Sequence, residues 1–439
     1  MAELDEVLAV TLRDLAAEAP ALPPLSLRAR RRIRARRSAA IVASAAAVAG
    51  IVAGAVIGAQ ALTHPAPRQA GPRHPTTAYV LSGSGTVTPI RTATNTILPP
   101  IDLGKGRGLC AMAIAPDGKT AYVASYGPGP AFLGTVTPIR TATNKVLRPV
   151  KAGPGPCAIA ITPNGKTVYV VNQPTDTVTP IQTATNTALP PITVGSRPLA
   201  IAITPDSKTA YVITRGSGAR CPDSVTPIRT ATNTALRPIH LGGCPVAIAI
   251  TPNGKTAYVA DSSKTAHGSE NSQVTPIRTA TNTALRPIKI RQIPAAIAIT
   301  PDGKTAYTVN FAGSRGVTVT PIRIATNTAL PPITVGPTFP QQLPAIAITP
   351  NGSTAYVITN APGPTHQDAM TPIRTATNTV LPPITVGRGS CAIAITPDGK
   401  TAYVTNMTSG TVTPIQTATN TAQPPIKVGR GPCAIAITG

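Results

Sequence analysis

The chain has 439 residues and a formal net charge of +24, because 39 Lys and Arg residues outnumber 15 Asp and Glu residues. Charged residues make up only 12% of it and aromatic residues 3%, Trp is absent, and there are 50 prolines and 36 glycines. This composition disfavours a conventional enzyme with one large core. The hydrophobic content of 42% and a strict internal repeat argue equally against a disordered chain.

The first 37 residues are predicted to be a cytoplasmic segment. Residues 2–19 have the periodicity of a short amphipathic helix, with Leu4, Leu8, Leu12 and Leu15 on one stripe. Prolines at residues 20–24 end this helix, and seven arginines follow between residues 28 and 37. We interpret the arginine run as a topology signal and not as a nucleic-acid site, so no nucleic-acid partner is expected.

Residues 38–62 contain no charged side chain and are long enough to cross a bilayer as one helix. Because the arginines precede this helix, the positive-inside rule predicts a plasma-membrane protein with everything after residue 62 outside the cytoplasm. Residues 63–76 are then a Pro-rich linker. In the alternative interpretation, Ala59-Gln60-Ala61 is a signal-peptidase site and the protein is secreted after cleavage near Ala61.

From residue 77 to the C-terminus the chain repeats one unit eight times. Each unit carries four segments, of the types AIAITP[D/N]GK, TAYV, VTPI[R/Q]-TATN and L[P/R]P[I/V]. Tyr79 in the first TAYV segment and Tyr403 in the last are 324 residues apart in seven steps, an average period of about 46. Such a period, with four short β segments per unit, is typical of a β-propeller blade.

We name the predicted strands a (AIAIT), b (TAYV), c (VTPI) and d (PPITVG), from the centre of the propeller outward. Proline in every copy of d suits an outer edge strand, and proline in strand c predicts a local bulge. The chain begins with strand b and ends with a lone strand a at residues 434–438. The sequence therefore predicts an all-β propeller over residues 77–439, with eight four-stranded blades closed by the C-terminal strand; seven blades are the alternative.

These segments resemble the YVTN-type β-propeller repeat family, whose units read AIAxxPDGKxxYVxN…VxVIDxATNxVxxxIxVG. The resemblance covers all eight copies and implies a bacterial protein. Family propellers commonly have seven blades, and the family has Asp where strand c ends here in Arg or Gln. The acidic helix, arginine run and single span further resemble actinobacterial anti-sigma-like membrane proteins, which implies an actinobacterial source.

Strand order places the a–b and c–d turns on one side of the propeller, which we call the basic face. It is predicted to carry Arg91, Lys119, Arg140, Lys166, Lys208, Arg229, Lys255, Arg278, Lys304, Arg323, Arg374 and Lys400. The linker reaches the first blade from this side, so we expect the basic face to contact the membrane and its anionic lipid head groups. A face that is merely solvated is the alternative.

The b–c and d–a loops lie on the opposite side, the loop face. Variable loops on a repeated scaffold commonly carry binding specificity. We therefore expect an unknown protein or a polymer of the cell envelope to bind here. The candidate contact residues are Tyr126, Phe132, Arg215, Arg220, His267, Phe311, Arg315 and His366.

Six cysteines in an exported domain predict disulfides. Four of them occupy the same position before strand a, in blades that are consecutive once the ring closes. The predicted pairs are Cys110–Cys157, Cys391–Cys433 and Cys221–Cys244. A thiolate metal site at the mouth of the channel is the sharper alternative. Free thiols in a cytosolic protein are the third interpretation, and the predicted topology argues against it.

The sequence contains no recognisable catalytic motif, so no catalytic residue, cofactor or metal is predicted, and the propeller is expected to be a monomer. The leading hypothesis is a membrane-anchored binding scaffold outside the cytoplasm. A second is a transmembrane sensor that relays to the cytoplasmic helix. A third is a propeller hydrolase of the lactonase kind or a redox enzyme.

Overall fold

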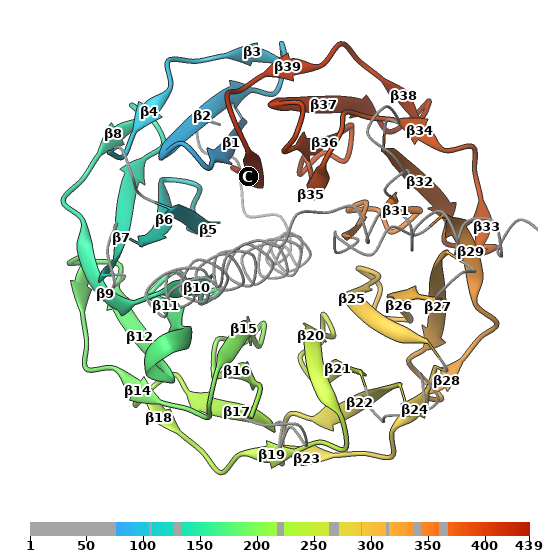
Figure 1. Ribbon diagram of the computed structural model, residues 1–439. Coiled ribbons are helices and arrows are strands. Elements are labelled where there is room, and N and C mark those ends of the chain that lie inside the picture. The colour runs from blue at the N-terminus through green and yellow to red at the C-terminus, as the bar shows by residue number, and fades with distance from the viewer. Residues whose placement is uncertain are drawn as a thin grey trace, which may run out of the picture. The chain divides into compact units, whose positions relative to one another are not determined.

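The computed structural model describes residues 76–104, 108–126, 133–216, 224–262, 272–290, 292–312, 316–337, 345–359 and 368–439. Eight antiparallel sheets form a ring, which confirms the all-β propeller and its eight blades (Figure 1). The predicted segments 1–37 and 38–62, and the linker apart from Thr76, lie outside the described residues. Among the described residues, no helix has the length and apolar character needed to span a bilayer.

Each blade contains one inner strand of type a and one strand of type b beside it. The inner strands are β5 (Gly108–Ile114), β10 (Pro156–Ile161), β15 (Pro198–Ile203), β20 (Cys244–Ile250), β25 (Ile293–Ile299), β30 (Ile346–Ile348), β35 (Ser390–Ile395) and β40 (Pro432–Ile437). The b strands are β1 (Thr77–Ser82), β6 (Thr120–Tyr126), β11 (Thr167–Asn172), β16 (Thr209–Thr214), β21 (Thr256–Ser262), β26 (Thr305–Phe311), β31 (Thr354–Thr359) and β36 (Thr401–Asn406). A short 3-10 helix, η1 (Gln173–Thr175), follows β11.

The third strand of each blade is of type c, and the outer d strand consists of two short pieces. The c strands are β2 (Thr86–Arg91), β7 (Leu133–Arg140), β12 (Thr177–Gln182), β17 (Ser224–Arg229), β22 (Gln273–Arg278), β27 (Val317–Arg323), β32 (Ala369–Arg374) and β37 (Thr411–Gln416). The outer pairs are β3 (Thr96–Ile97) and β4 (Ile101–Asp102), β8 (Lys145–Val146) and β9 (Val150–Pro154), β13 (Thr187–Ala188) and β14 (Ile192–Thr193), β18 (Thr234–Ala235) and β19 (Ile239–His240), β23 (Thr283–Ala284) and β24 (Ile288–Lys289), β28 (Thr328–Ala329) and β29 (Ile333–Gly336), β33 (Thr379–Val380) and β34 (Ile384–Thr385), and β38 (Thr421–Ala422) and β39 (Ile426–Lys427).

The proline of strand c explains why strand d is split. Pro89 of β2 pairs with Tyr79 of β1 in an unbroken register, so the bulge predicted in strand c is wrong. On its outer side Pro89 has no N–H to donate, and only its carbonyl takes part, accepting the N–H of Leu98 at 2.9 Å. The two outer pieces therefore pair with β2 on either side of this position, at Ile90 and at Val87.

The bulge lies instead at the start of strand a. In seven of the eight inner strands the pairing with strand b shifts by one residue, as between Pro156 and Ala158 of β10. The extra residue, here Cys157, stands outside the regular pairing; we call it the bulge residue. A bulge changes the direction of the side chain that it carries. The seven bulge residues are Cys433, Cys110, Cys157, Leu199, Val246, Ala295 and Cys391.

The hydrophobic core is distributed over the eight junctions between blades. The cluster between the first two blades in chain order, for example, joins Leu81 and Val87 to Met112 and Val123. Buried Ala, Ile and Val side chains on both faces of each sheet explain the uninterrupted apolar runs of strands a and b. Stability therefore comes from contacts between neighbouring blades, as in other repeat proteins.

The C-terminal strand closes the ring as predicted. β40 pairs with β1 from Ala78 to Ser82, so the first blade is built from both ends of the chain. The Thr77 N–H donates to the hydroxyl of Thr438 at 2.8 Å, and the Thr438 N–H donates to the carbonyl of Thr77 at 3.0 Å.

A second ring of contacts joins the blades through the strand-b tyrosines. Each tyrosine is at most 2% exposed and donates its hydroxyl proton to the Asn of the TATN turn in the next blade, at 2.6 to 3.2 Å. These asparagines have φ between 52° and 57°, a conformation that Asn tolerates better than most residues. The pairs are Tyr79–Asn144, Tyr122–Asn186, Tyr169–Asn233, Tyr211–Asn282, Tyr258–Asn327, Tyr307–Asn378, Tyr356–Asn420 and Tyr403–Asn95.

Candidate functional site

All twelve cations predicted for the basic face lie within the described residues, and all twelve are exposed. Six lysines follow the a–b turns, and six arginines end strand c. The two groups are adjacent within a blade, since Thr141, which follows Arg140, donates its N–H to the carbonyl of Lys119 at 3.0 Å. Four blades hold a complete Lys–Arg pair: Lys119 and Arg140, Lys208 and Arg229, Lys255 and Arg278, and Lys304 and Arg323.

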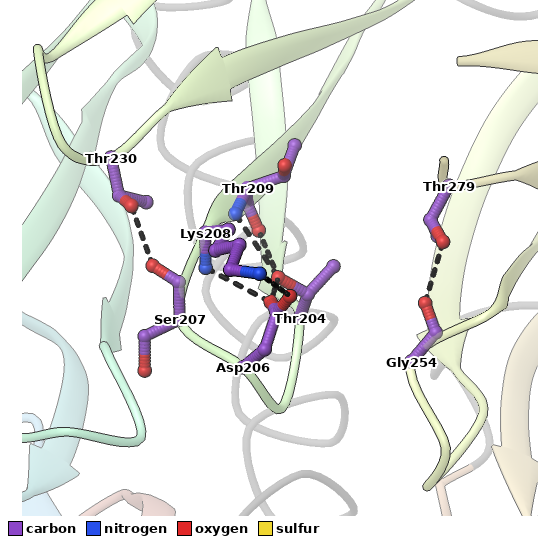
Figure 2. A network of polar contacts seen from close by, with 8 residues as sticks. All are labelled: Thr204, Asp206, Ser207, Lys208, Thr209, Thr230, Gly254 and Thr279. Carbon is purple, nitrogen blue, oxygen red and sulfur yellow. Dashed lines mark hydrogen bonds and ion pairs between the residues drawn. The ribbon is translucent and has the colours of Figure 1, made fainter. Parts of the chain in front are cut away.

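The turns that present these lysines are held by side-chain hydrogen bonds (Figure 2). In the a–b turn of the fourth blade, Asp206 Oδ1 accepts the Thr204 hydroxyl at 2.6 Å and the Lys208 N–H at 3.0 Å. In the next blade Asn253 accepts the corresponding groups at 2.8 and 3.0 Å. Because Asp and Asn are interchangeable here, the acidic residues on this face are explained by the turn alone.

The c–d turns are tied to the a–b turns of the same blade. The Thr230 hydroxyl donates to the carbonyl of Ser207, and the Thr279 hydroxyl donates to the carbonyl of Gly254 at 2.6 Å (Figure 2). These bonds fix the arginine that ends strand c beside the lysine of the a–b turn. The cations are thus exposed side chains on a rigid backbone.

Acidic side chains neutralise the cations of the basic face only weakly. Within the described ranges, ion pairs join Lys208 to Asp206, Lys304 to Asp302 and Lys400 to Asp398 at 3.6 to 4.0 Å. The lysine side chains are 81 to 83% exposed, so water and salt screen these pairs strongly. Partial burial would raise the pKa of the Asp206 carboxyl, but bonds from Thr204 and the Lys208 N–H, with the Lys208 charge, lower it below its usual value.

The chain enters the propeller on this same face. The carbonyl of Thr76 accepts both the N–H and the hydroxyl of Thr92, which lies directly after Arg91, at 3.1 and 2.9 Å. The predicted approach of the chain from the basic side is therefore confirmed at Thr76.

The loop face is described only in part. Tyr126 and Phe311 end β6 and β26, and Arg215 follows β16; each is partly buried. These residues belong to the second, sixth and fourth blades, so the structure does not bring them together. Arg215 Nε is buried and, among the described residues, has no hydrogen-bond partner. Phe132, Arg220, His267, Arg315 and His366 lie outside the described residues.

Two exposed arginines of the loop face were not among the candidates. Arg388 and Arg430 each stand between two glycines in a d–a loop, three residues before Cys391 and Cys433. The repeated pattern Gly-Arg-Gly-x-Cys was the signal in the sequence that could have found them. They add positive charge beside the first residues of β35 and β40.

The structure corrects two of the predicted disulfides. Cys110, Cys157, Cys391 and Cys433 are free thiols, so the pairs Cys110–Cys157 and Cys391–Cys433 are not formed. The bulge aims two of these thiols at carbonyl groups of the next blade: Cys391 Sγ donates to Pro432 at 3.2 Å, and Cys157 Sγ donates to Pro198 at 3.5 Å.

The third predicted pair, Cys221–Cys244, is only half described. Cys221 lies outside the described residues, whereas Cys244 is buried at the start of β20. Over the described ranges, no three His, Cys, Asp or Glu side chains are grouped so that they could hold a metal ion. A metal site with three or more such ligands is thus not formed by the described part of the channel mouth.

Burial keeps the four bulge thiols protonated. It raises the pKa of Cys157 and of Cys391 to about 12 and that of Cys433 to about 11. The pKa of Cys110 also rises well above its usual value, mainly through burial and further through the charges of Cys157 and Cys433. Such thiols are poor nucleophiles at neutral pH.

Comparison with known proteins identifies the fold. No family model matches the chain, and no curated protein matches it either, so the resemblance to the YVTN-type repeat stays a prediction. Among solved structures, hydrazine synthase of Kuenenia stuttgartiensis is 24% identical, with a TM-score of 0.53 over 70% of this chain and 95% of that one.

Two further structures are more distant in sequence. The dihydro-heme d1 dehydrogenase NirN is 16% identical, with a TM-score of 0.66 over 85% of this chain and 77% of its own. A putative 6-phosphogluconolactonase of Bacteroides fragilis is 17% identical, with a TM-score of 0.54 over 84% of this chain and all of its own. At such identities these likenesses show the propeller fold alone.

Proposed function

We propose that this protein is a membrane-attached binding scaffold outside the cytoplasm. In this proposal the basic face rests on anionic lipid head groups, and the loop face points away and binds a protein or an envelope polymer. The observation that carries the proposal is the gathering of twelve exposed cations on one face, the same face on which the chain enters at Thr76.

The geometry of the basic face favours a flat anionic surface as its partner. The cations sit on equivalent turns of a closed ring of blades, so they form a circle and not a line. A lipid surface can meet such a circle over most of its circumference, whereas a linear polyanion can follow only part of it. Each Lys or Arg near an anionic membrane contributes roughly 1 kcal/mol of binding free energy, and this contribution falls with salt.

The sequence before Thr76 supports attachment to the membrane. Seven arginines precede the 25 uncharged residues 38–62, and the linker between this segment and the propeller has only 14 residues. A linker this short would hold the basic face near the bilayer, since it spans at most about 50 Å when fully extended. The alternative of cleavage near Ala61 is tested by the N-terminal sequence of the mature protein.

The test measures binding of a fragment, residues 64–439, to vesicles of phosphatidylglycerol and phosphatidylcholine. This fragment contains the propeller and nearly all of the linker. Arg229→Gln, Arg278→Gln and Arg323→Gln together remove three charges, and the fold already accepts glutamine at the equivalent Gln182 and Gln416. At about 1 kcal/mol per charge, the affinity should fall roughly 100-fold.

The matched control removes three exposed lysines of the outer strands by Lys151→Gln, Lys289→Gln and Lys427→Gln. These changes lower the net charge equally but lie away from the basic face, so they should reduce the affinity much less. Equal losses in the two triple variants would show that net charge and not the basic face determines binding. Binding indifferent to lipid charge and salt would refute the membrane contact itself.

A further inference from the structure

Each inner strand a meets strand b of its blade in a last residue pair at the loop face, which we call the mouth pair. In the fourth blade this pair follows the pairing of Pro198 with Thr214, and the Arg215 N–H donates to the Arg197 carbonyl at 3.3 Å. The described residues include the mouth pairs of seven blades, and of these only the pair in the fourth blade is charged. The other six pairs are Gly431–Gly83, Gly108–Tyr126, Gly155–Gln173, Cys244–Ser262, Ile293–Phe311 and Gly389–Met407.

No ion pair neutralises these two arginines within the described part of the chain. Like charges directly opposite each other destabilise a pair of strands. The neighbouring carboxylate, that of Asp176, accepts the backbone N–H of Arg197 at 2.6 Å, so it holds the backbone and not a guanidinium group. The fourth blade therefore carries two positive charges at a position where the other described blades carry none.

The side chain of Arg215 is also partly withdrawn from water. Its Nε is buried and has no hydrogen-bond partner among the described residues, while the side chain as a whole is only partly buried. Burial of a charged group without a partner is unfavourable. An anion that reaches the accessible part of this guanidinium group would compensate its charge.

The backbone of Arg197 is unfavourable as well. Its φ is 53°, a left-handed conformation that disfavours every side chain with a Cβ. Three other blades have glycine at this position, Gly155, Gly389 and Gly431, with φ between 57° and 72°. The fold thus favours glycine here, and backbone strain of this kind is common at functional sites. Together with the opposed charges, it indicates that the arginine has a role other than stabilising the blade.

We propose that Arg197 and Arg215 form a binding site for a phosphate monoester. Opposite residues of an antiparallel pair have Cβ atoms about 5 Å apart, which is less than the length of an arginine side chain, so both guanidinium groups can reach one ligand. A phosphate monoester carries roughly −1.5 to −2 charge at neutral pH and has three acceptor oxygens. A single guanidinium group already satisfies the two oxygens of a carboxylate, so phosphate fits two arginines better.

This site gives the loop face a ligand chemistry, and in that respect it rests on the proposed binding role of this face. It does not rest on the lipid contact. Arg215 follows the loop-face end of β16, whereas Arg229 of the basic face pairs with Thr209 at the other end of that strand. Phosphate binding and vesicle binding can therefore fail separately.

The experiment is calorimetric titration of the full chain, in a non-ionic detergent at neutral pH and low salt, with inorganic phosphate and with glycerol 1-phosphate. We expect one saturable site per chain for both probes; a site that takes only inorganic phosphate would overturn the assignment to a monoester. Arg197→Gly and Arg215→Gln each introduce the residue that the third blade has in that position, Gly155 or Gln173, so both variants should fold. Each should lower the affinity by roughly tenfold or more, since each removes charge-assisted hydrogen bonds.

Lys289→Gln and Lys427→Gln are the matched controls, because each removes one exposed cation of an outer strand; both should keep the affinity of the wild-type chain. Thermal melts give a second measurement. Phosphate should raise the melting temperature of the wild type and the controls more than that of the two arginine variants. Without phosphate, Arg197→Gly should melt no lower than the wild type, because glycine adopts this φ without strain.

Four results would overturn the proposal. They are the absence of a saturable site in the wild type, unchanged affinity in both arginine variants, an equal loss of affinity in the lysine controls, and competition by acetate as strong as that by phosphate.

Discussion

The ring of tyrosine hydroxyls predicts a steep loss of stability at alkaline pH. Burial raises the pKa of seven strand-b tyrosines from 10 to about 12, and that of Tyr211 also rises. A pKa that is higher in the folded than in the unfolded chain contributes stability that is complete below pH 10. This stability is lost as the pH rises towards 12, because the unfolded chain then releases its tyrosine protons first.

The expected loss follows from the size of the shift. Between about pH 9 and about pH 11, a tyrosine whose pKa rises from 10 to about 12 on folding loses about 1.3 kcal/mol of its contribution to the free energy of unfolding. Halving this value for residual solvent screening leaves about 5 kcal/mol for eight tyrosines. Because whole domains are stable by only about 5 to 15 kcal/mol, the propeller should unfold cooperatively within this window.

The assay is urea unfolding of residues 64–439 at several pH values, with tyrosinate absorbance recorded in parallel. A variant with Tyr122→Phe and Tyr258→Phe is the control. It loses about 1 kcal/mol per hydrogen bond at neutral pH, but its stability should fall less steeply above pH 10. Titration of all eight tyrosines near pH 10 in the folded protein, without loss of stability, would refute the reasoning.

Three further changes test the fold and the signalling hypothesis. Removing residues 433–439 takes away the strand that pairs with β1 and should lower the melting temperature by more than about 10 °C, whereas an unchanged melt would contradict ring closure. Asp206→Ala should cost about 1 kcal/mol in thermal unfolding and Asp206→Asn almost nothing, because Asn253 makes the same two bonds; equal costs would contradict the turn assignment. Deleting residues 2–19 from the full chain should leave its cellular output unchanged if the protein is a scaffold, whereas loss of that output would favour the sensor.

The Tyr–Asn contacts illustrate what sequence reasoning could not reach. Within the chain order the paired residues are 64 to 71 positions apart, and Tyr403 and Asn95 are 308 apart. The repeat predicts a buried tyrosine and a turn asparagine in every unit, since both follow from local patterns. It does not say that the tyrosine of one blade reaches the asparagine of the next, because that depends on the packing angle between sheets.

The sequence by itself determined the propeller class, the strand order, the closing strand and the two faces, and it favoured eight blades over seven, which the structure confirms. Alternating side chains and turn residues are local features of the sequence, and each of the eight repeats shows them again. The number of repeats can be counted directly along the chain. Only the tertiary structure decided that the bulge lies in strand a and not in strand c, and hence where the thiols of Cys391 and Cys157 point. The physical reason is that a bulge depends on how two strands pair, and it changes the direction of the side chain that it carries. The carbonyls that accept hydrogen bonds from these two thiols also belong to the neighbouring blade, so neither feature can be read from local sequence.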